Sequence, residues 1–183
     1  MLVYVFWHHP RAGVALDEYA GALLAFESVF KAQGHVEDIQ SFRMEPVSWF
    51  GGGRHVYTDW YVMTDSARLD PVNEHAVTGP CEQPHRAVAA MAGAGAGSLY
   101  DLTHAGCRVG QARHGVWFSK PNGMAYAALR ELLAAVQVEG VCLLQRRMGL
   151  GPSPEFCLLG VEPIELPRSL TGETRALAPV GQV

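Results

Sequence analysis

The stretch YVFWHHPRAG, residues 4–13, has a counterpart later in the chain, GVWFSKPNG, residues 115–123. Aligned on Pro10 and Pro121, both stretches contain a valine, two aromatic residues, two polar residues and the proline, and a glycine follows soon after. Runs of β-branched and aromatic residues that end at a Pro–Gly breaker are typical of β-strands. The sequence therefore predicts two equivalent strands, each at the start of a repeated unit.

The segments after these two strands also follow one order. In the first copy, leucine and aromatic residues recur every three or four positions over 15–34, which predicts an amphipathic helix that ends at a glycine. Two further strands are expected at 37–47 and 56–65, joined by a hairpin turn at GGGR, 51–54. In the second copy, the corresponding helix and strands are expected at 124–140, 141–149 and 155–163.

The region between the copies completes the first unit. Helices are expected near Pro71 and Pro84, because proline is well placed in the first turn of a helix. SLYDLT, 98–103, has the pattern of a short strand, so the first unit follows the ferredoxin-like order β-α-β-β-α-β. The second unit ends early, and VEPIELP, 161–167, is its candidate closing strand.

We therefore predict an α+β fold in which two fused ferredoxin-like βαββ repeats have antiparallel sheets that form an α/β barrel. The first repeat is expected over 1–106 and the second, shortened repeat over 107–166. Residues 167–183 mix proline, glycine, threonine and charge without periodicity, so we expect a loosely ordered C-terminal tail.

Two such units in one chain resemble the dimeric α/β-barrel superfamily, in which paired ferredoxin-like sheets close into a barrel. The resemblance covers residues 1–166 and rests on element order and repetition. It implies one of several activities, because members include cofactor-independent monooxygenases, haem-handling enzymes, lactone isomerases and ligand-binding proteins. The segment DWYVMTDSARLDPVNEHAVTGPCEQPH, 59–85, also resembles a segment of an uncharacterised bacterial family with two fused repeats, which implies no activity.

The composition excludes several classes of function. Fourteen basic and eighteen acidic side chains give a net charge of −4, and no basic cluster is longer than Arg146–Arg147, so we expect no nucleic-acid partner. No apolar run approaches the roughly 18 residues of a membrane span, and the N-terminal residues lack the pattern of a signal peptide. We expect a soluble, cytoplasmic protein without a membrane partner. The predicted scaffold also allows a homodimer that forms through the outer surfaces.

The four cysteines are widely spaced and form neither a CxxC pair nor a zinc-ribbon pattern. Two of them lie inside apolar runs, where a free cysteine behaves as a small hydrophobic residue. We therefore predict structural thiols rather than disulfides or catalytic groups at Cys81, Cys107, Cys142 and Cys157.

Alternation along the strands predicts a ligand site. If the apolar residues of QSFRM and TDWYVM face the helices, then Arg43, Asp59 and Tyr61 face the inside of the barrel. Arg147 has the same parity in the second copy, and Trp7 is a further candidate on the first strand. Such groups would suit a small aromatic or carboxylate ligand. The alternative is an internal Arg–Asp ion pair that stabilises the packing.

Two histidines are candidate acid–base groups, together with Tyr61. His9 lies at a strand end, where a solvated side chain is the alternative, and His85 lies at an expected helix start, where the positive end of the helix dipole favours a neutral ring. No HxH, HExxH or His–carboxylate pattern is present, so we expect neither a metal nor a cofactor.

The glycine-rich stretch AGAGAGS, 92–98, does not fit a dinucleotide-binding loop. In such a loop the glycines follow a strand and open a helix, whereas here they follow an expected helix and precede an expected strand. We interpret the stretch as a flexible helix C-terminus.

Two functions remain open on this scaffold. The first is a small-molecule enzyme of the cofactor-independent monooxygenase or isomerase kind, with a pocket in the barrel. The second is a non-catalytic protein that binds a small ligand or supports assembly. A pocket with histidine or tyrosine near Arg43 would favour the enzyme, and a barrel filled by side chains would favour the alternative.

Overall fold

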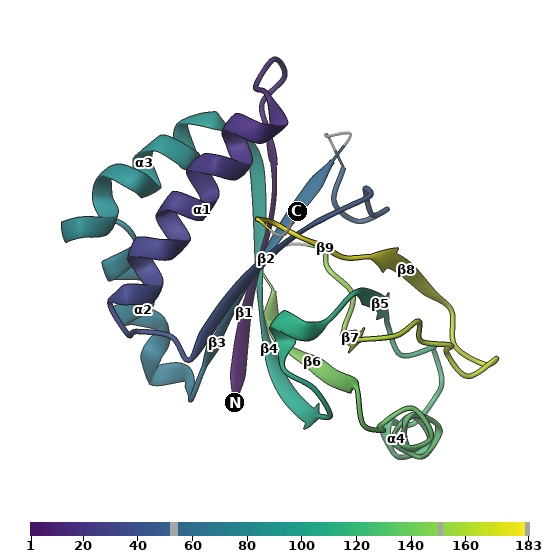
Figure 1. Cartoon of the computed structure of the whole chain (residues 1–183). Coiled ribbons are helices and arrows are strands. Elements are labelled where there is room, and N and C mark those ends of the chain that lie inside the picture. Colours follow the sequence, from purple (N-terminus) through teal and green to yellow (C-terminus); the bar gives the residue numbers. More distant parts are fainter. Residues whose placement is uncertain (52–54, 150–151, 182–183) are drawn as a thin grey trace.

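The computed structural model of the chain describes residues 1–51, 55–149 and 152–181. Its nine strands form one antiparallel sheet in the order β8-β5-β7-β6-β4-β1-β3-β2-β9, which confirms the α+β class (Figure 1). The strands are β1 Leu2–Pro10, β2 Asp38–Met44, β3 Val56–Met63, β4 Ala92–Ala105, β5 His114–Phe118, β6 Val141–Gly149, β7 Phe156–Gly160, β8 Gly172–Ala176 and β9 Ala178–Pro179. The helices are α1 Leu16–Ala32, α2 Leu69–Ala76, α3 Glu82–Met91 and α4 Tyr126–Ala134, with short 3-10 turns at Ser66–Arg68, Gly79–Cys81 and Val109–Gln111.

The sheet contains two groups of four strands with the same spatial order. The groups are β1–β4 and β5–β8, and their spatial orders are β4-β1-β3-β2 and β8-β5-β7-β6. In each group the strand that comes last in the chain lies beside the one that comes first, and the third and second strands follow. The two groups join where β4 pairs with β6. The division into repeats at 1–106 and 107–166 stays a prediction, and the shared strand order favours it.

The C-terminal segment differs from the expected loose tail. β8 pairs with β5 along five residues, and β9 pairs with β2 through Phe42 and Arg43. Residues 161–167, expected to supply the closing strand, do not form one. The sequence GETRA of β8 is half-exposed and carries no apolar alternation, so its place in the sheet depends on main-chain hydrogen bonds rather than on a hydrophobic face.

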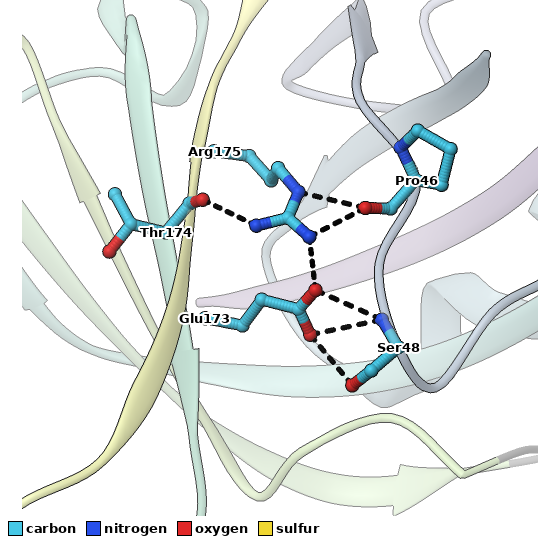
Figure 2. A network of polar contacts seen from close by, with 5 residues as sticks. All are labelled: Pro46, Ser48, Glu173, Thr174 and Arg175. Atoms are coloured by element: carbon cyan, nitrogen blue, oxygen red, sulfur yellow. Dashed lines mark hydrogen bonds and ion pairs between the residues drawn. The ribbon is translucent and has the colours of Figure 1, made fainter. Parts of the chain in front are cut away.

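Side chains of β8 also hold the connection between β2 and β3, as Figure 2 shows. The Arg175 guanidinium donates to the Pro46 carbonyl from Nε at 2.8 Å and from a terminal nitrogen at 2.6 Å. The Glu173 carboxylate accepts from the Ser48 amide at 3.0 Å and from its hydroxyl at 2.8 Å, and it pairs with Arg175. This network connects the last part of the chain to the first unit, and the pairing of β9 with β2 nearly closes the sheet.

Helices α1, α2 and α3 lie together on one side of β1–β4, while α4 lies apart from them beside the second group of strands (Figure 1). The α1 helix spans 17 residues, and Gly34 follows it with a φ of 70°, a left-handed conformation that glycine adopts at little cost. None of the helices in the described ranges combines the length and apolar character needed to cross a membrane.

The barrel interior is filled by side chains. Its core contains buried residues from seven strands, including three tryptophans that are at most 1% exposed: Trp7, Trp60 and Trp117. A second core lies between the first unit and α1–α3, and a third lies beneath α4. A filled barrel is the outcome expected for the non-catalytic alternative, so an enzyme site in this chain has to lie outside the barrel core.

The expected orientation of β2 and β3 is wrong. Phe42, Met44, Trp60 and Val62, expected to face the helices, belong to the barrel core, so Asp59 and Tyr61 face the helices instead. Every residue of β3 is buried. Because both faces of this strand are covered, alternation of polarity could not identify the inner one.

The stretch AGAGAGS is also not a flexible helix end, because residues 92–105 form β4. A Cβ on Gly95 would lie 2.3 Å from Cζ of Phe6, and a Cβ on Gly97 would lie 2.5 Å from the hydroxyl of Tyr4. The glycines thus leave room for the aromatic side chains of β1. The turn expected at 51–54 lies, apart from Gly51, outside the described residues.

Candidate functional site

A cavity of about 370 Å³ lies between the first unit of the sheet and helices α1–α3. Its volume is within the usual range for small-molecule sites. Val77, which is 49% exposed, belongs to its lining, so the cavity reaches the surface beside the end of α2. Most of the lining is aromatic or aliphatic, and its aromatic members are Tyr4, Phe6, Tyr19, Phe26, Phe30 and Tyr61. We call it the helix-side cavity.

His8 is the central polar group of this cavity. It follows Tyr4 and Phe6 on the helix-facing side of β1 and is only 2% exposed. Its ring lies between those of Phe6 and Tyr57, with centroids 5.4 and 5.7 Å away and interplanar angles of 20° and 23°. This stacking fixes the plane of the imidazole before any ligand enters.

Both ring nitrogens of His8 face a polar group. Nδ1 is hydrogen-bonded to the Tyr19 hydroxyl, and Nε2 lies 3.0 Å from Oδ2 of Asp59. The second contact has the distance of an ion pair but not the alignment of a hydrogen bond. A carboxylate beside Nε2 stabilises a proton there, which leaves Nδ1 to accept from Tyr19.

The Asp59 carboxylate continues the network away from the cavity. Ser41 lies directly across from it on β2, and the Ser41 hydroxyl is within hydrogen-bond reach of both Asp59 and Glu27. A hydroxyl has one hydrogen and can donate to only one of two carboxylates. The second carboxyl must therefore be protonated and donate to the serine oxygen.

Glu27 is the carboxyl group that carries this proton. Burial raises its pKa to about 8, and the neighbouring negative charge of Asp59 acts in the same direction. Hydrogen bonding to Ser41 and the charge of Lys31 oppose the shift without cancelling it. At neutral pH the network therefore begins at a protonated Glu27 and runs through Ser41 to Asp59, which lies beside His8.

Helix α1 supplies both ends of this network. Tyr19 and Glu27 are eight residues apart, slightly more than two turns, so both point to the same face of the helix. That face also buries Leu23, Phe26 and Phe30. The apolar residues keep water from the polar chain, and every polar member thus depends on its neighbours for hydrogen bonds.

Other titratable groups of the cavity stay neutral near pH 7. Burial raises the pKa of Tyr61 well above its ordinary value, and the charges of Asp59 and Glu27 raise it further. Burial also raises the pKa of Tyr19, so both phenols keep their protons. Burial lowers the pKa of His85, whose ring packs edge-on to Phe26 at 5.4 Å.

The structure brings together three of the residues predicted from the sequence. Asp59, Tyr61 and His85 all line the helix-side cavity. The other four lie elsewhere: Trp7, His9, Arg43 and Arg147. The roles assigned to the seven stay predictions, but Arg43, Asp59 and Tyr61 do not face the inside of the barrel as expected.

The four residues outside the helix-side cavity have separate surroundings. Trp7 is in the barrel core, and the ring of His9 lies 5.9 Å from that of Phe50. Arg43 is exposed on β2, opposite Tyr57, rather than inside the barrel. Arg147 is half-exposed and donates to both carboxylate oxygens of Asp101, at 3.0 and 2.6 Å.

Sequence reasoning missed four members of the network: His8, Tyr19, Glu27 and Ser41. Glu27 could have been identified from the sequence. It lies four residues after Leu23 and three before Phe30, a spacing that places an acidic side chain on the apolar face of the helix. His8 could have been found from its alternation with Tyr4 and Phe6, had the face of β1 been known.

The cavity contains few groups suited to a metal. Within the described ranges, no set of three or more His, Cys, Asp or Glu side chains is arranged as metal ligands would be. His8 and Asp59 supply a base and a carboxylate that orients it. This pair is suited to moving a proton in an apolar environment.

No protein-family profile and no curated protein sequence matches the chain. The chain is similar to the solved structure of a chlorite dismutase-like protein, with a TM-score of 0.53 and 11% identity over 99% of this chain and 97% of that one. A monooxygenase-like protein from Lactobacillus acidophilus has a TM-score of 0.56 and 8% identity, covering 97% and 93%. An anthrone oxidase-like protein aligns with a TM-score of 0.48 and 12% identity over 99% and 94%. The first two show a shared ferredoxin-type fold with a nearly closed antiparallel sheet.

Proposed function

We propose that this chain is a small-molecule enzyme of the cofactor-independent monooxygenase or isomerase kind, and that it removes a proton from an aromatic substrate in the helix-side cavity. The buried contact of His8 with Tyr19 on one side and Asp59 on the other supports this proposal. The His8 and Asp59 side chains are only 3% and 4% exposed, and this burial strengthens their electrostatic interaction. The aromatic lining is suited to flat, unsaturated rings.

The proton would move through Tyr19. The substrate gives its proton to the phenol oxygen while the Tyr19 proton passes to Nδ1 of His8, and the resulting imidazolium is stabilised by Asp59. In an isomerase, this proton returns to another carbon of the substrate anion. In a monooxygenase, the carbanion of a CH₂ group adds O₂, takes the proton back as a hydroperoxide, and loses water to give a ketone. Substrate and O₂ supply all the atoms and electrons of that reaction.

Proton abstraction can be measured directly with flat carbon acids of two and three rings, 2-tetralone and anthrone. We expect the protein to accelerate exchange of their acidic CH₂ protons with D₂O, followed by NMR, and to consume O₂ if it is a monooxygenase. His8→Gln, Tyr19→Phe and Asp59→Asn should each reduce the exchange rate by about 10²-fold or more. Arg130→Gln, at an exposed position on α4 outside the cavity, is the matched control and should leave the rate unchanged.

Two outcomes would contradict this assignment. Loss of exchange in His85→Ala but not in Tyr19→Phe would identify His85 as the base. Saturable binding of both probes with exchange at the uncatalysed rate would favour the alternative, a non-catalytic ligand-binding protein. A cytoplasmic location and a homodimer stay predictions from the sequence.

The shape of the cavity can be tested at Gly95. In Gly95→Ala the new methyl group displaces the tip of the Phe6 ring, which lines the cavity. We expect binding of the fluorescent probe 2-naphthol to weaken by about 1 kcal/mol, roughly fivefold, through loss of one aromatic contact. Gly21→Ala on α1 adds a methyl group with nothing within 4 Å and should leave binding intact. Equal affinities of the two variants would exclude Phe6 from the binding site.

A further inference from the structure

Two cysteines that are far apart in the sequence meet in the structure. Cys107 lies in the connection after β4, and Cys142 is the second residue of β6, 35 positions later. Their Sγ atoms are 3.3 Å apart. A disulfide requires a separation of about 2.05 Å, so bond formation needs the sulfurs to approach by only about 1.3 Å.

The backbone holds this pair in place. The amide of Gly106 donates to the Val141 carbonyl at 2.9 Å, and the Gly140 amide donates to the Gly106 carbonyl at 2.8 Å. A Cβ on Gly106 would lie 2.3 Å from the carbonyl oxygens of Val138 and Val141. Only glycine permits this close approach, which keeps Cys107 beside β6.

The two thiols differ in access. Cys142 is fully buried, and its Sγ donates to the Cys107 carbonyl at 2.9 Å. Cys107 is half-buried and lines a cleft of about 670 Å³ together with Lys31, Asp38 and Arg108, which we call the Cys107 cleft. The hydrogen bond between the thiols lowers the pKa of Cys142 to about 7, because it stabilises the thiolate. The same hydrogen bond raises the pKa of Cys107, so near neutral pH the thiolate is on buried Cys142 and the Cys107 thiol faces the cleft.

We propose that Cys107 and Cys142 form a redox site, which is converted to a disulfide by exchange with a low-molecular-weight disulfide of the glutathione type that enters the Cys107 cleft. As the Cys107 sulfur attacks one sulfur of this molecule, the adjacent Cys142 thiolate takes up the Cys107 proton, and the other sulfur leaves as a small thiolate. Cys142 gives this proton to the small thiolate, and the Cys142 thiolate then attacks Sγ of Cys107, so that the second small thiol leaves after taking up a proton from water. The protein loses two electrons and one proton, and the small disulfide is reduced to two thiols.

This site is separate from the proposed proton-transfer site. Cys142 belongs to the barrel core and Cys107 packs against it, whereas His8 and Asp59 face α1 on the other side of the sheet. Formation of the disulfide would tether the 106–112 connection to β6. We therefore expect a local change in the dynamics of this connection rather than a direct effect on the helix-side cavity.

The experiment uses the full chain and oxidised glutathione as the probe. After incubation in buffers of increasing oxidised-to-reduced glutathione ratio, we expect non-reducing peptide mapping to show one linked pair, Cys107–Cys142, that dithiothreitol reverses. Cys142→Ser should accumulate glutathione on Cys107, because no second thiol resolves the mixed disulfide. Cys107→Ser should remain unmodified at Cys142, which is buried. Amide hydrogen exchange over 106–112 should slow several-fold in the oxidised wild-type protein.

The proposal can be tested even if a variant fails to fold, because the main measurement is the peptide map of the wild-type protein. Four free thiols at every glutathione ratio, with circular dichroism showing an intact fold, would exclude the redox site. Linkage of Cys81 to any partner would show that oxidation follows unfolding. Linkage of Cys142 to Cys157, which lies on the paired strand β7 in the same core, would assign the disulfide to a different pair. Cys81 and Cys157 are both buried and serve as internal controls.

Discussion

Replacing Trp7 by alanine should lower the free energy of unfolding by about 3–5 kcal/mol, the usual cost of removing a large aromatic side chain from a core. Trp7 is fully buried in the barrel core, and its ring contacts Trp49 edge-on at 4.8 Å and Tyr100 at 6.3 Å. The surrounding strands are fixed by their hydrogen bonds, so they cannot close around the missing indole. Urea unfolding followed by circular dichroism gives this free energy.

Trp7→Phe is the matched control. The indole nitrogen has no hydrogen-bond partner among the described residues, so phenylalanine removes volume without breaking a hydrogen bond. We expect this variant to lose about 1–2 kcal/mol, and 2-naphthol binding to persist in it. A Trp7→Ala protein with nearly unchanged stability but no probe binding would instead support the ligand-binding role predicted from the sequence.

Glu27→Gln should remove most of the pH dependence of stability between pH 5 and pH 8. The pKa of Glu27 is raised from 4.5 to about 8, so in this range the folded chain holds a proton that the unfolded chain releases. The free energy of unfolding must therefore fall as the pH rises, by an amount on the order of 3 kcal/mol over this interval. Glutamine stays neutral and can still donate to Ser41, so the variant avoids this loss.

The measurement is a series of urea unfolding curves for the two proteins at pH values from 5 to 8. Their difference isolates Glu27 from the other titrating groups, since these are common to both chains. Glu18→Gln, on an exposed face of the same helix, should follow the wild-type curve. If Glu27→Gln lowered stability equally at every pH, the wild-type carboxyl would be ionised and the proposed direction of the hydrogen bonds would be reversed.

Local sequence patterns predicted most elements of the fold. The strands at 2–10 and 141–149 and the helix of 16–32 have strong periodicity and clear end signals, so their types were identified correctly. β8 was missed because GETRA has neither apolar alternation nor a turn signal of its own. Its position depends on β5 and on residues 46–48, which lie far away in the sequence.

The candidate site was harder to predict, because its position depends on which face of the sheet lines the barrel and which face packs against the helices. His8 and His9 are adjacent and point to opposite faces, and the sequence offers no reason to choose between them. Asp59 and Tyr61 were identified as candidates, but on the wrong side of the sheet. The link from Asp59 through Ser41 to Glu27 requires the register of two strands and the position of a helix, which local patterns do not contain.

The contacts of β8 and β9 have a consequence for folding kinetics. The hydrogen bonds from Ser48 to Glu173 and from Arg175 to Pro46 join residues 125 and 129 positions apart. Because chain entropy must be lost before such distant contacts form, a topology of this kind folds slowly. Until β9 arrives, the backbone edge of β2 remains unpaired and available to other chains. The yield of refolding should therefore decrease as the protein concentration rises, through association of partly folded molecules at this edge.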